Sequence, residues 1–296
     1  MKEKKSLNNL PNTPLGAGGI TIVGTGLIGG SLALVLKDKG LVGNIIGVDN
    51  NKEHQEKALE LGIVDKVLPL KEAIAKSKLI VLAVPVDALN KILPAVLDQV
   101  EEQVVMDMSS IKESVIDLVI NHPKRRRFVA SHPMWGTEYS GPGAAVKTAF
   151  ANKAAVICDA ENSDADALGL VKDLYTAIGM HLVYMDAHAH DLHAAYISHI
   201  SHITSFALAN TVLEKEKEED AIFELASGGF ESTVRLAKSN AATWVPVFRQ
   251  NRENVLDVLN EHISQLRKFK SCLEKENYEY LEELIENANG IRRIIK

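Results

Sequence analysis

Short apolar runs alternate with amphipathic segments over the first two-thirds of the chain. Seven of these runs predict buried strands, and they cover residues 20–23, 45–48, 79–84, 104–106, 128–130, 154–157 and 182–184. Helical patterns lie between most of them. Strands that are apolar on both faces and separated by helices are typical of βαβ units in a mostly parallel sheet. Residues 19–186 are therefore predicted to form an α/β domain.

The pattern changes after Met185. Residues 189–213 carry one long helical pattern, and the remaining chain repeats Leu, Val and Ile at intervals of three and four with no convincing strand. Residues 187–296 are therefore predicted to form an all-α domain. Its first helix has few charges before Glu214, which implies burial on several sides. We expect this domain to build a homodimer, although an intrachain bundle could bury the same face.

Composition places the chain among folded globular proteins. Hydrophobic residues make up 46% and charged residues 24% of its 296 positions, which fits neither disorder nor a fibrous repeat. Residues 1–18 are rich in Asn, Pro, Gly and Lys and lack periodicity, so we interpret them as a flexible extension. No stretch approaches 18 uncharged apolar residues, so neither export nor a membrane span is expected.

Cysteine content and charge narrow the setting further. Cys158 and Cys272 are the only cysteines, which excludes a disulfide framework and suits a reducing, cytoplasmic compartment. The net charge is -6, so nothing favours nucleic acid or an anionic membrane as a partner. The single basic cluster, residues 124–127, is expected to be a solvated turn.

A glycine loop stands directly between the first predicted strand and a helix. The G-x-G-x-x-G pattern of Gly24, Gly26 and Gly29 allows a tight turn, close approach of a pyrophosphate and close packing of helix on strand. Asp49, at the end of the second strand, can accept hydrogen bonds from both ribose hydroxyls of NAD and would repel a 2′-phosphate, so NAD is favoured over NADP. The predicted cofactor-binding residues are Gly24, Thr25, Gly26, Leu27, Ile28, Gly29, Asp49 and Val84.

Polar groups cluster where later strands end, at the edge where open α/β sheets bind ligands. Residues 107–112 follow the predicted strand 104–106, and His132 follows the predicted strand 128–130, in small and apolar surroundings. A histidine at this edge can accept a proton from a carbinol as hydride departs, because its usual pKa of about 6.5 leaves it largely neutral at pH 7. A hydrogen-bonded structural role is the alternative for His132.

Six of the ten histidines lie between His181 and His202. The run His188, His190, Asp191 and His193 approaches the H-x-H-x-D-H pattern of metallo-β-lactamases, but its Asp stands one place too early. A pair of histidines three apart on a helix, as at the end of this segment, makes separate contacts more often than it holds a metal. We therefore predict no metal site.

The helical domain also carries candidate ligand-binding residues. Arg235 follows a glycine pair at 228–229 and could clamp a carboxylate with two hydrogen bonds. From the residues alone, pairing with a surface acid is the stronger alternative. Trp244 is likewise expected in a core or an interface.

Taken together, these segments resemble the prephenate and arogenate dehydrogenase family over residues 20–254. The resemblance rests on the glycine loop 24–30, Ser-His-Pro-Met-Trp-Gly-Thr-Glu at 131–138, Ile-Ser-His-Ile-Ser-His at 197–202, Gly-Gly-Phe at 228–230 and Thr-Val-Arg at 233–235. It implies a Rossmann-type dinucleotide-binding domain followed by a helical domain that interlocks two protomers. Trp135 and Ser201 depart from residues frequent in the family, which puts the shape of the pocket in doubt.

The resemblance also implies an activity and a set of roles. The expected reaction is NAD-dependent oxidative decarboxylation of prephenate to 4-hydroxyphenylpyruvate in tyrosine biosynthesis. His132 matches the catalytic histidine, and Ser110 is expected to orient it near the nicotinamide. Arg235 matches the residue that binds a substrate carboxylate, and Glu138 is expected to pair with it as a gate. His202 and Trp244 match residues that shape the substrate pocket.

Other functions remain open at this point. Arogenate is an alternative substrate, since an acid such as Glu138 could favour its ammonium group. Another dehydrogenase with a Rossmann domain and helices, such as a 3-hydroxyacid dehydrogenase or an imine reductase, typically places a Lys on the first helix of its second domain. Residues 189–213 contain no Lys, which weighs against it. A third alternative is a nucleotide-sensing protein that catalyses no reaction, in which the predicted catalytic residues would have no function.

Overall fold

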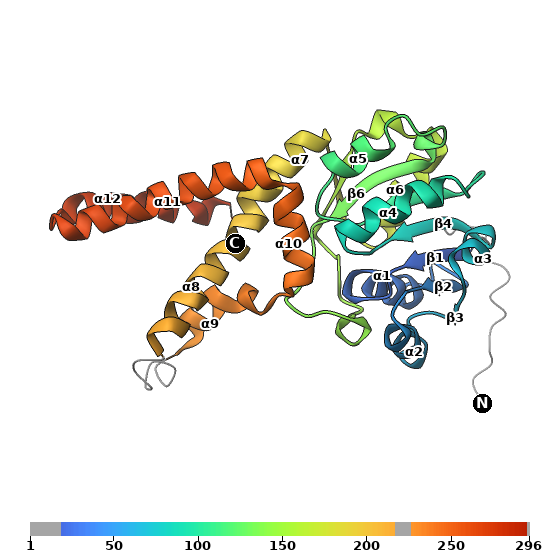
Figure 1. Cartoon of the computed structure of the whole chain (residues 1–296), viewed down its shortest axis with the longest axis horizontal. Helices are drawn as coiled ribbons and strands as arrows, with labels where there is room; N and C mark the ends of the chain where they lie inside the picture. The colour runs from blue at the N-terminus through green and yellow to red at the C-terminus, as the bar shows by residue number, and fades with distance from the viewer. Residues whose placement is uncertain (1–18, 217–225, 295–296) are drawn as a thin grey trace.

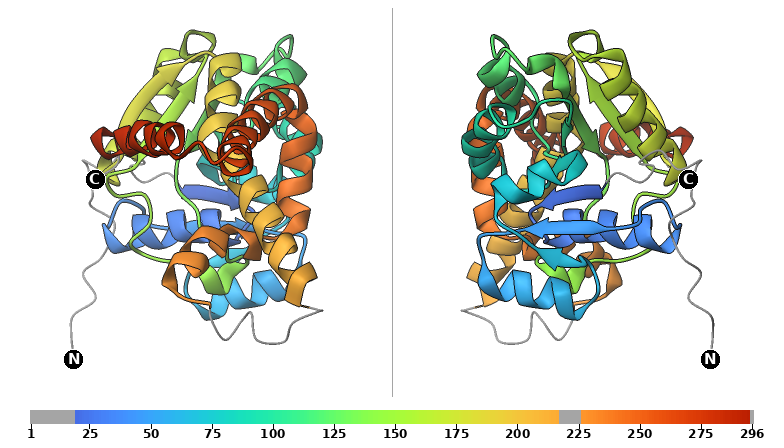
Figure 2. Two further views of the ribbon diagram at one scale, coloured as in Figure 1. Left: turned by 90° about the vertical axis from the view of Figure 1, so that its left-hand side faces the viewer. Right: turned by 90° about the vertical axis from the view of Figure 1, so that its right-hand side faces the viewer.

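The structure is a computed structural model and describes residues 19–216 and 226–294. Figure 1 shows an α/β domain beside a domain made only of helices, and in the left view of Figure 2 the helical domain lies in front of the sheet. The predicted fold class is confirmed. The predicted flexible extension, residues 1–18, lies outside the described residues.

One eight-stranded sheet forms the centre of the α/β domain, in the order β3-β2-β1-β4-β5-β6-β7-β8. The strands are β1 (Gly19–Val23), β2 (Ile45–Val48), β3 (Lys66–Val67), β4 (Ser77–Leu82), β5 (Val104–Asp107), β6 (Phe128–Pro133), β7 (Ala154–Cys158) and β8 (His181–Met185). The chain reverses its direction of travel across the sheet between β1 and β4. In open α/β sheets this switch point is where ligands bind, outside the carboxyl ends of the strands.

Helices cover both faces of the sheet and make three layers. The helices α1 (Leu27–Asp38), α2 (Lys52–Glu60) and α6 (Ala165–Ala177) pack on one face. The helices α3 (Leu70–Ala75), α4 (Val86–Leu97) and α5 (Glu113–Val119) pack on the other. Each face buries its own apolar cluster, which explains why the central strands are apolar on both sides.

Two details of the sheet differ from the sequence prediction. The short edge strand β3 was not predicted, because its two residues are exposed or half-buried and show no apolar run. All seven predicted strands are present, but β6 and β7 pair antiparallel. The connection from β6 to β7 holds only the short helix Pro142–Ala144, and an antiparallel neighbour needs no crossover helix. The sheet is therefore mixed.

The helical domain begins with one continuous run. It consists of α7 (Ala187–Ala194), a π-helical turn (Ala195–His199) and α8 (Ile200–Glu216), which corresponds to the long helix predicted over 189–213. We keep the domain boundary between residues 186 and 187. The remaining helices are α9 (Gly228–Val234), α10 (Ala241–Gln250), α11 (Arg252–Glu274) and α12 (Tyr278–Asn289), with short 3₁₀ helices at Arg235–Lys238 and Gly290–Arg293.

The end of α10 docks the helical domain onto the sheet domain. Gln250 donates to Asp87 of α4 at 2.9 Å and accepts from Ser114 of α5 at 2.7 Å. Arg249 forms an ion pair with the same Asp87. Because α4 and α5 both start at the carboxyl edge of the sheet, this contact brings the helical domain against the predicted ligand-binding edge. Among the described residues, no helix has both the length and the apolar character needed to cross a membrane.

Candidate active site

The glycine loop has the geometry of a dinucleotide site. Gly24 has φ +91, and a Cβ there would lie 2.3 Å from the carbonyl oxygen of Ala83. A Cβ at Gly29 would lie 2.1 Å from the carbonyl oxygen of Gly24, so the helix packs tightly on the loop. At Gly26, by contrast, no heavy atom lies within 4 Å of an added Cβ. This open space stands at the N-terminus of α1, where backbone N–H groups favour a phosphate.

Asp49 is fixed beside this loop. Its Oδ2 accepts hydrogen bonds from the backbone N of Thr25 at 2.9 Å and from the Thr25 hydroxyl at 3.0 Å. Its Oδ1 accepts from the backbone N of Asn51 at 3.0 Å. The carboxylate therefore stands at the end of β2, directly next to the glycine loop, as a ribose-binding acid must. These residues fit a dinucleotide cofactor.

The other predicted cofactor residues lie around the same loop. Leu27 and Ile28 form the first turn of α1, and a Cβ at Gly136, after β6, would lie 4.0 Å from Cδ1 of Ile28. Val84 follows β4 and packs against the loop, because a Cβ at Gly24 would lie 2.9 Å from its Cγ1. The structure thus places the predicted cofactor-binding residues together at the switch point.

His132 lies at the carboxyl edge, near the end of β6, and its partner is another histidine. Its Nδ1 is 2.9 Å from Nε2 of His190, and Nδ1 of His190 is 2.7 Å from Oδ1 of Asp191. Burial is the main cause that holds the pKa of His132 well below its usual value, and the neighbouring basic side chains of His190, Lys112 and His199 act in the same direction. A His132 that is neutral at pH 7 can act as a proton acceptor.

Ser110 follows β5 at the same edge and is half-buried. The hydrogen bond that the structure gives His132 runs to His190 and not to Ser110. His190 was not predicted as a site residue, because its surroundings in the sequence pointed only to a metal pattern. The spacing of 58 residues between the two histidines gives no signal that they meet.

A buried ion pair lies beneath this edge. Asp107, the last residue of β5, pairs with the Nζ of Lys112, and both side chains are fully buried. The other carboxylate oxygen of Asp107 accepts from the backbone N of Ser131 at 3.0 Å, next to His132. Breaking such a pair leaves an uncompensated buried charge. We infer that it anchors the loop that carries Ser110 and the end of β6 that carries His132.

Arg235, in the 3₁₀ helix after α9, meets Glu138 from the loop after β6. Nη1 of Arg235 donates to Oε2 of Glu138 at 2.6 Å. The pKa of Glu138 lies below its usual value, because its own backbone N–H and then Arg235 donate to the carboxylate against the opposing effect of burial. This is the contact expected from the sequence, and it joins the two domains. Whether it acts as a gate stays a prediction.

An aromatic wall stands on the helical domain beside these groups. The rings of His202 and Trp244 stack with centroids 3.4 Å apart. His202 donates from Nδ1 to the carbonyl oxygen of Ser198 at 3.0 Å, and burial lowers its pKa. A neutral His202 therefore presents an acceptor at Nε2. The predicted pocket residues on the helical domain are thus in contact with each other.

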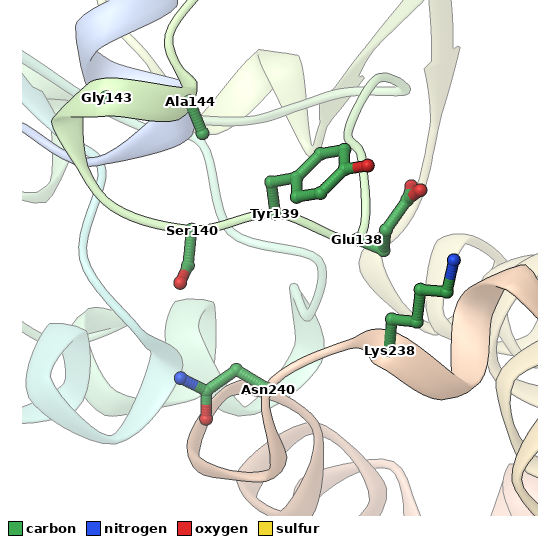
Figure 3. A pocket seen from close by; sticks show the side chains of 7 residues that line it. All are labelled: Glu138, Tyr139, Ser140, Gly143, Ala144, Lys238 and Asn240. Atoms are coloured by element: carbon green, nitrogen blue, oxygen red, sulfur yellow. The ribbon is translucent and has the colours of Figure 1, made fainter.

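A cavity of about 700 Å³ opens between the two domains at this point (Figure 3). It is lined by Glu138, Tyr139, Ser140, Gly143, Ala144, Lys238 and Asn240. Lys238, in the 3₁₀ helix that also carries Arg235, puts a positive charge on the wall of this cavity, whereas Arg235 itself does not line it. The cavity has room for a small anionic molecule next to the ion pair, although His132 itself does not line it.

Within residues 19–216 and 226–294, no group of three or more His, Cys, Asp or Glu side chains is arranged to hold a metal ion. The histidines of the segment 181–202 make separate contacts instead. Nδ1 of His199, for example, is 3.2 Å from Nδ2 of Asn251, which belongs to the link between α10 and α11.

These features define a two-domain dehydrogenase, with a nucleotide-binding α/β domain and a helical domain that closes the site. A model of the family "Prephenate dehydrogenase, nucleotide-binding domain" matches residues 32–184, and "Prephenate dehydrogenase, dimerization domain" matches residues 186–287. The chain belongs to the prephenate dehydrogenase family.

Individual relatives agree with this assignment. The chain is 30% identical to a prephenate dehydrogenase of Bacillus subtilis over 277 residues, 92% of this chain and 75% of that protein. It is 28% identical to a cyclohexadienyl dehydrogenase of Zymomonas mobilis, over 94% of this chain and 96% of that protein.

Solved structures show the same fold. Prephenate dehydrogenase from Aquifex aeolicus, in complex with hydroxyphenyl propionate and NAD+, has a TM-score of 0.86 at 30% identity and covers 95% of this chain and 99% of its own. Synechocystis arogenate dehydrogenase has a TM-score of 0.71 at 26% identity, over 94% and 100%. The predicted family, fold and kind of enzyme are confirmed.

Proposed function

We propose that this protein catalyses the NAD-dependent oxidative decarboxylation of prephenate to 4-hydroxyphenylpyruvate. The observation that carries the proposal is a buried, neutral His132 near the end of β6, together with Arg235, which contacts Glu138 on the loop that follows the same strand, and Lys238 in the same 3₁₀ helix as Arg235. This arrangement offers a proton acceptor and two cations to a substrate that has a ring hydroxyl and two carboxylates. Family membership and NAD+ in the Aquifex structure support NAD as the cofactor.

In this reaction His132 would transfer the proton, and the other site residues would bind the cofactor and the substrate. When bound, NAD supplies the acceptor for the hydride of the ring carbinol. His132 takes the hydroxyl proton as the hydride leaves, which converts the C–O bond towards a carbonyl. The C–C bond to the ring carboxylate then breaks, its electron pair aromatises the ring, and His132 returns the proton to the ring oxygen. The products are 4-hydroxyphenylpyruvate, carbon dioxide and NADH, and no net proton is released.

The remaining site residues would bind and orient. Arg235 would hold a substrate carboxylate in exchange for Glu138, and His202 with Trp244 would form the wall against the ring. Ser110 would lie near the nicotinamide, and Asp49 with the loop Gly24 to Gly29 would hold the adenosine half of NAD.

Arogenate is the second candidate substrate, since the chain also resembles an arogenate dehydrogenase. Prephenate carries a keto side chain where arogenate carries an amino acid, and Glu138 stands where an ammonium group could find a partner. The choice is tested by NADH formation at 340 nm with prephenate and arogenate in parallel. Turnover of prephenate supports the proposal, turnover of arogenate alone replaces it, and absence of turnover with both refutes it.

We also propose that the protein is a homodimer through its helical domain, in the cytoplasm. The family model names this part a dimerization domain. Large apolar side chains on its helices stay exposed in the single chain, among them Ile197 (63%), Leu266 (55%), Leu273 (60%) and Ile285 (50%). Such a surface favours association with a second copy. Light scattering after size-exclusion chromatography would contradict the proposal by showing a monomer at micromolar concentration.

A further inference from the structure

The contact between His132 and His190 crosses the domain boundary. His132 stands on β6 of the α/β domain, whereas His190 stands on α7 of the helical domain. The two rings meet edge to face, with centroids 5.1 Å apart and an angle of 70° between their planes. His190 is 2% exposed and Asp191 is 2% exposed, so this chain of side chains is closed to solvent on the helical side.

The partners of Asp191 fix where the protons lie. Oδ1 of Asp191 accepts from the backbone N of Lys112 at 2.8 Å, and Oδ2 accepts from the backbone N of Glu113 at 3.0 Å. Lys112 is the N-cap and Glu113 the first residue of α5, so these two backbone N–H groups have no partner within the helix. Both oxygens of Asp191 thus act as acceptors, and we assign the same role to Oδ1 towards His190, so that Nδ1 of His190 carries the proton in their shared hydrogen bond.

The position of the proton on His190 determines the tautomer of His132. A His190 that carries its proton on Nδ1 alone has a lone pair at Nε2, and Nδ1 of His132 then donates across the 2.9 Å contact. A neutral His132 with its proton on Nδ1 has its lone pair at Nε2. We propose that His190 and Asp191 are positioning residues that hold His132 in the tautomer whose Nε2 accepts the substrate proton.

The same residues also hold the two domains in place. Asn251 donates from Nδ2 to the carbonyl oxygen of Asp191 at 2.7 Å, and Asp191 itself caps α5 of the other domain. The proton acceptor is therefore correctly prepared only when α7 is docked on α5. This inference rests on the proposed function for the identity of the substrate. The tautomer of His132, however, can be measured in the enzyme without substrate.

The first test is the tautomer of His132 in the full-length enzyme, read from long-range ¹H–¹⁵N spectra and assigned by its loss in His132→Asn. We expect a proton on Nδ1 and none on Nε2 at neutral pH. In His190→Leu, which keeps an apolar side chain of moderate size but no acceptor, His132 should shift towards the Nε2-protonated form. A wild-type His132 protonated on Nε2 would overturn the proposal, whatever the enzyme turns over.

The second test separates positioning from packing. His190→Leu should lower kcat by about 10- to 100-fold, a part of the 10²- to 10⁴-fold that a positioned base contributes, with KM for NAD unchanged. His190→Gln offers Oε1 as an acceptor to Nδ1 of His132 and should recover most of this loss. The double variant His132→Asn/His190→Leu should be no slower than His132→Asn, because His190 acts through His132.

Opposite results would count against the inference. Equal losses in His190→Leu and His190→Gln, or further loss in the double variant, would show a structural role only. If His190→Leu does not fold, the tautomer of His132 in the wild-type enzyme and the kcat of His190→Gln still test whether His190 positions His132. If the wild-type enzyme turns over neither prephenate nor arogenate, the proposed function fails, whereas the spectra still report whether His190 sets the tautomer.

Discussion

Oε2 of Glu138 lies 2.6 Å from Nη1 of Arg235, so the cation expected to bind a substrate carboxylate is already paired with a carboxylate of the protein. The Arg235 side chain is 48% exposed and that of Glu138 is 9% exposed. A ligand carboxylate can therefore approach Arg235 from solvent, but it has to displace Glu138. We therefore expect the pair to adjust both the affinity for anionic substrates and the contact between the domains.

Removing the charge of Glu138 should show which substrate the pair favours. In Glu138→Gln the competitor for Arg235 is neutral, so KM for prephenate should fall about two- to fivefold, the size expected of a half-exposed ion pair. KM for arogenate should rise instead if Glu138 contacts its ammonium group. Steady-state kinetics with both substrates measure this, with Glu101→Gln, an exposed acid at the far end of β5, as the charge control. An unchanged KM for both substrates would place the substrate carboxylate elsewhere.

His132 and Arg235 should affect different kinetic constants. His132→Asn removes the proton acceptor and should lower kcat by about two to four orders of magnitude, with little change in NAD affinity. Arg235→Gln removes a contact made already in the ground state and should mainly raise KM for the substrate. Initial rates at varied prephenate and saturating NAD separate the two effects. Mild and equal effects of both substitutions would mean that the site lies elsewhere.

Gly26 and Gly29 offer a matched pair of substitutions in the cofactor loop. A Cβ at Gly26 meets no heavy atom within 4 Å, so Gly26→Ala should cost at most about 1 kcal/mol of unfolding free energy, as expected for Ala at a helix N-cap. The added methyl group occupies the space needed by a pyrophosphate, so the Kd for NAD should rise at least tenfold. Titration calorimetry measures that affinity.

In Gly29→Ala the new Cβ would lie 2.1 Å from the carbonyl oxygen of Gly24, so the loop or the helix must move. This variant should lose stability by about 1 to 3 kcal/mol, the usual cost of overpacking, as measured by urea unfolding. Retained NAD affinity in Gly26→Ala would contradict the placement of the pyrophosphate at this turn.

The sequence predicted the central strands of the sheet, but it predicted neither the edge strand β3 nor the direction of β7. Buried strands such as β4 and β5 are apolar on both faces, and this pattern is visible without a structure. The two residues of β3 carry no such pattern, and strand direction is not encoded in apolar periodicity, so the antiparallel β7 was missed. Arg125 was expected in a solvated turn, but it is 5% exposed and donates to the carbonyl oxygen of Phe128. A short basic run does not reveal which of its side chains folds back.

The sequence predicted those site residues that lie at strand ends or in local motifs. The glycine loop, Asp49 and His132 lie at the carboxyl ends of β1, β2 and β6, which run parallel in one sheet, so the sheet brings them to one edge. His190 lies on a helix of the other domain, and only the docking of α7 on α5 brings it to His132. Strand ends and local motifs do not reveal contacts across a domain interface, and the contact of Glu138 with Arg235 was expected only through the family resemblance.

Buried histidines should make the protein less stable in mild acid, and His199 tests this most sharply. It is fully buried, and burial lowers its pKa to about 4 against the opposing charge of Asp191. Between about pH 6.5 and about pH 4 the unfolded chain therefore binds a proton that the folded chain does not, so stability falls as the pH falls. The full effect is on the order of 3 kcal/mol, present above pH 6.5, and about 2 kcal/mol of it should be lost by pH 5.

Urea unfolding at pH 7.5 and pH 5, at one fixed protein concentration, measures this difference. His199→Asn keeps an acceptor for Asn251 and His199→Phe keeps a ring, but neither side chain titrates. Both variants should lose less stability than wild type between the two pH values, whatever their stability at pH 7.5. His132 and His202, whose pKa values are also lowered mainly by burial, are present in all three proteins, so the difference between wild type and variants reports mainly on His199. A wild-type loss matched by both variants would show that another group carries the pH dependence.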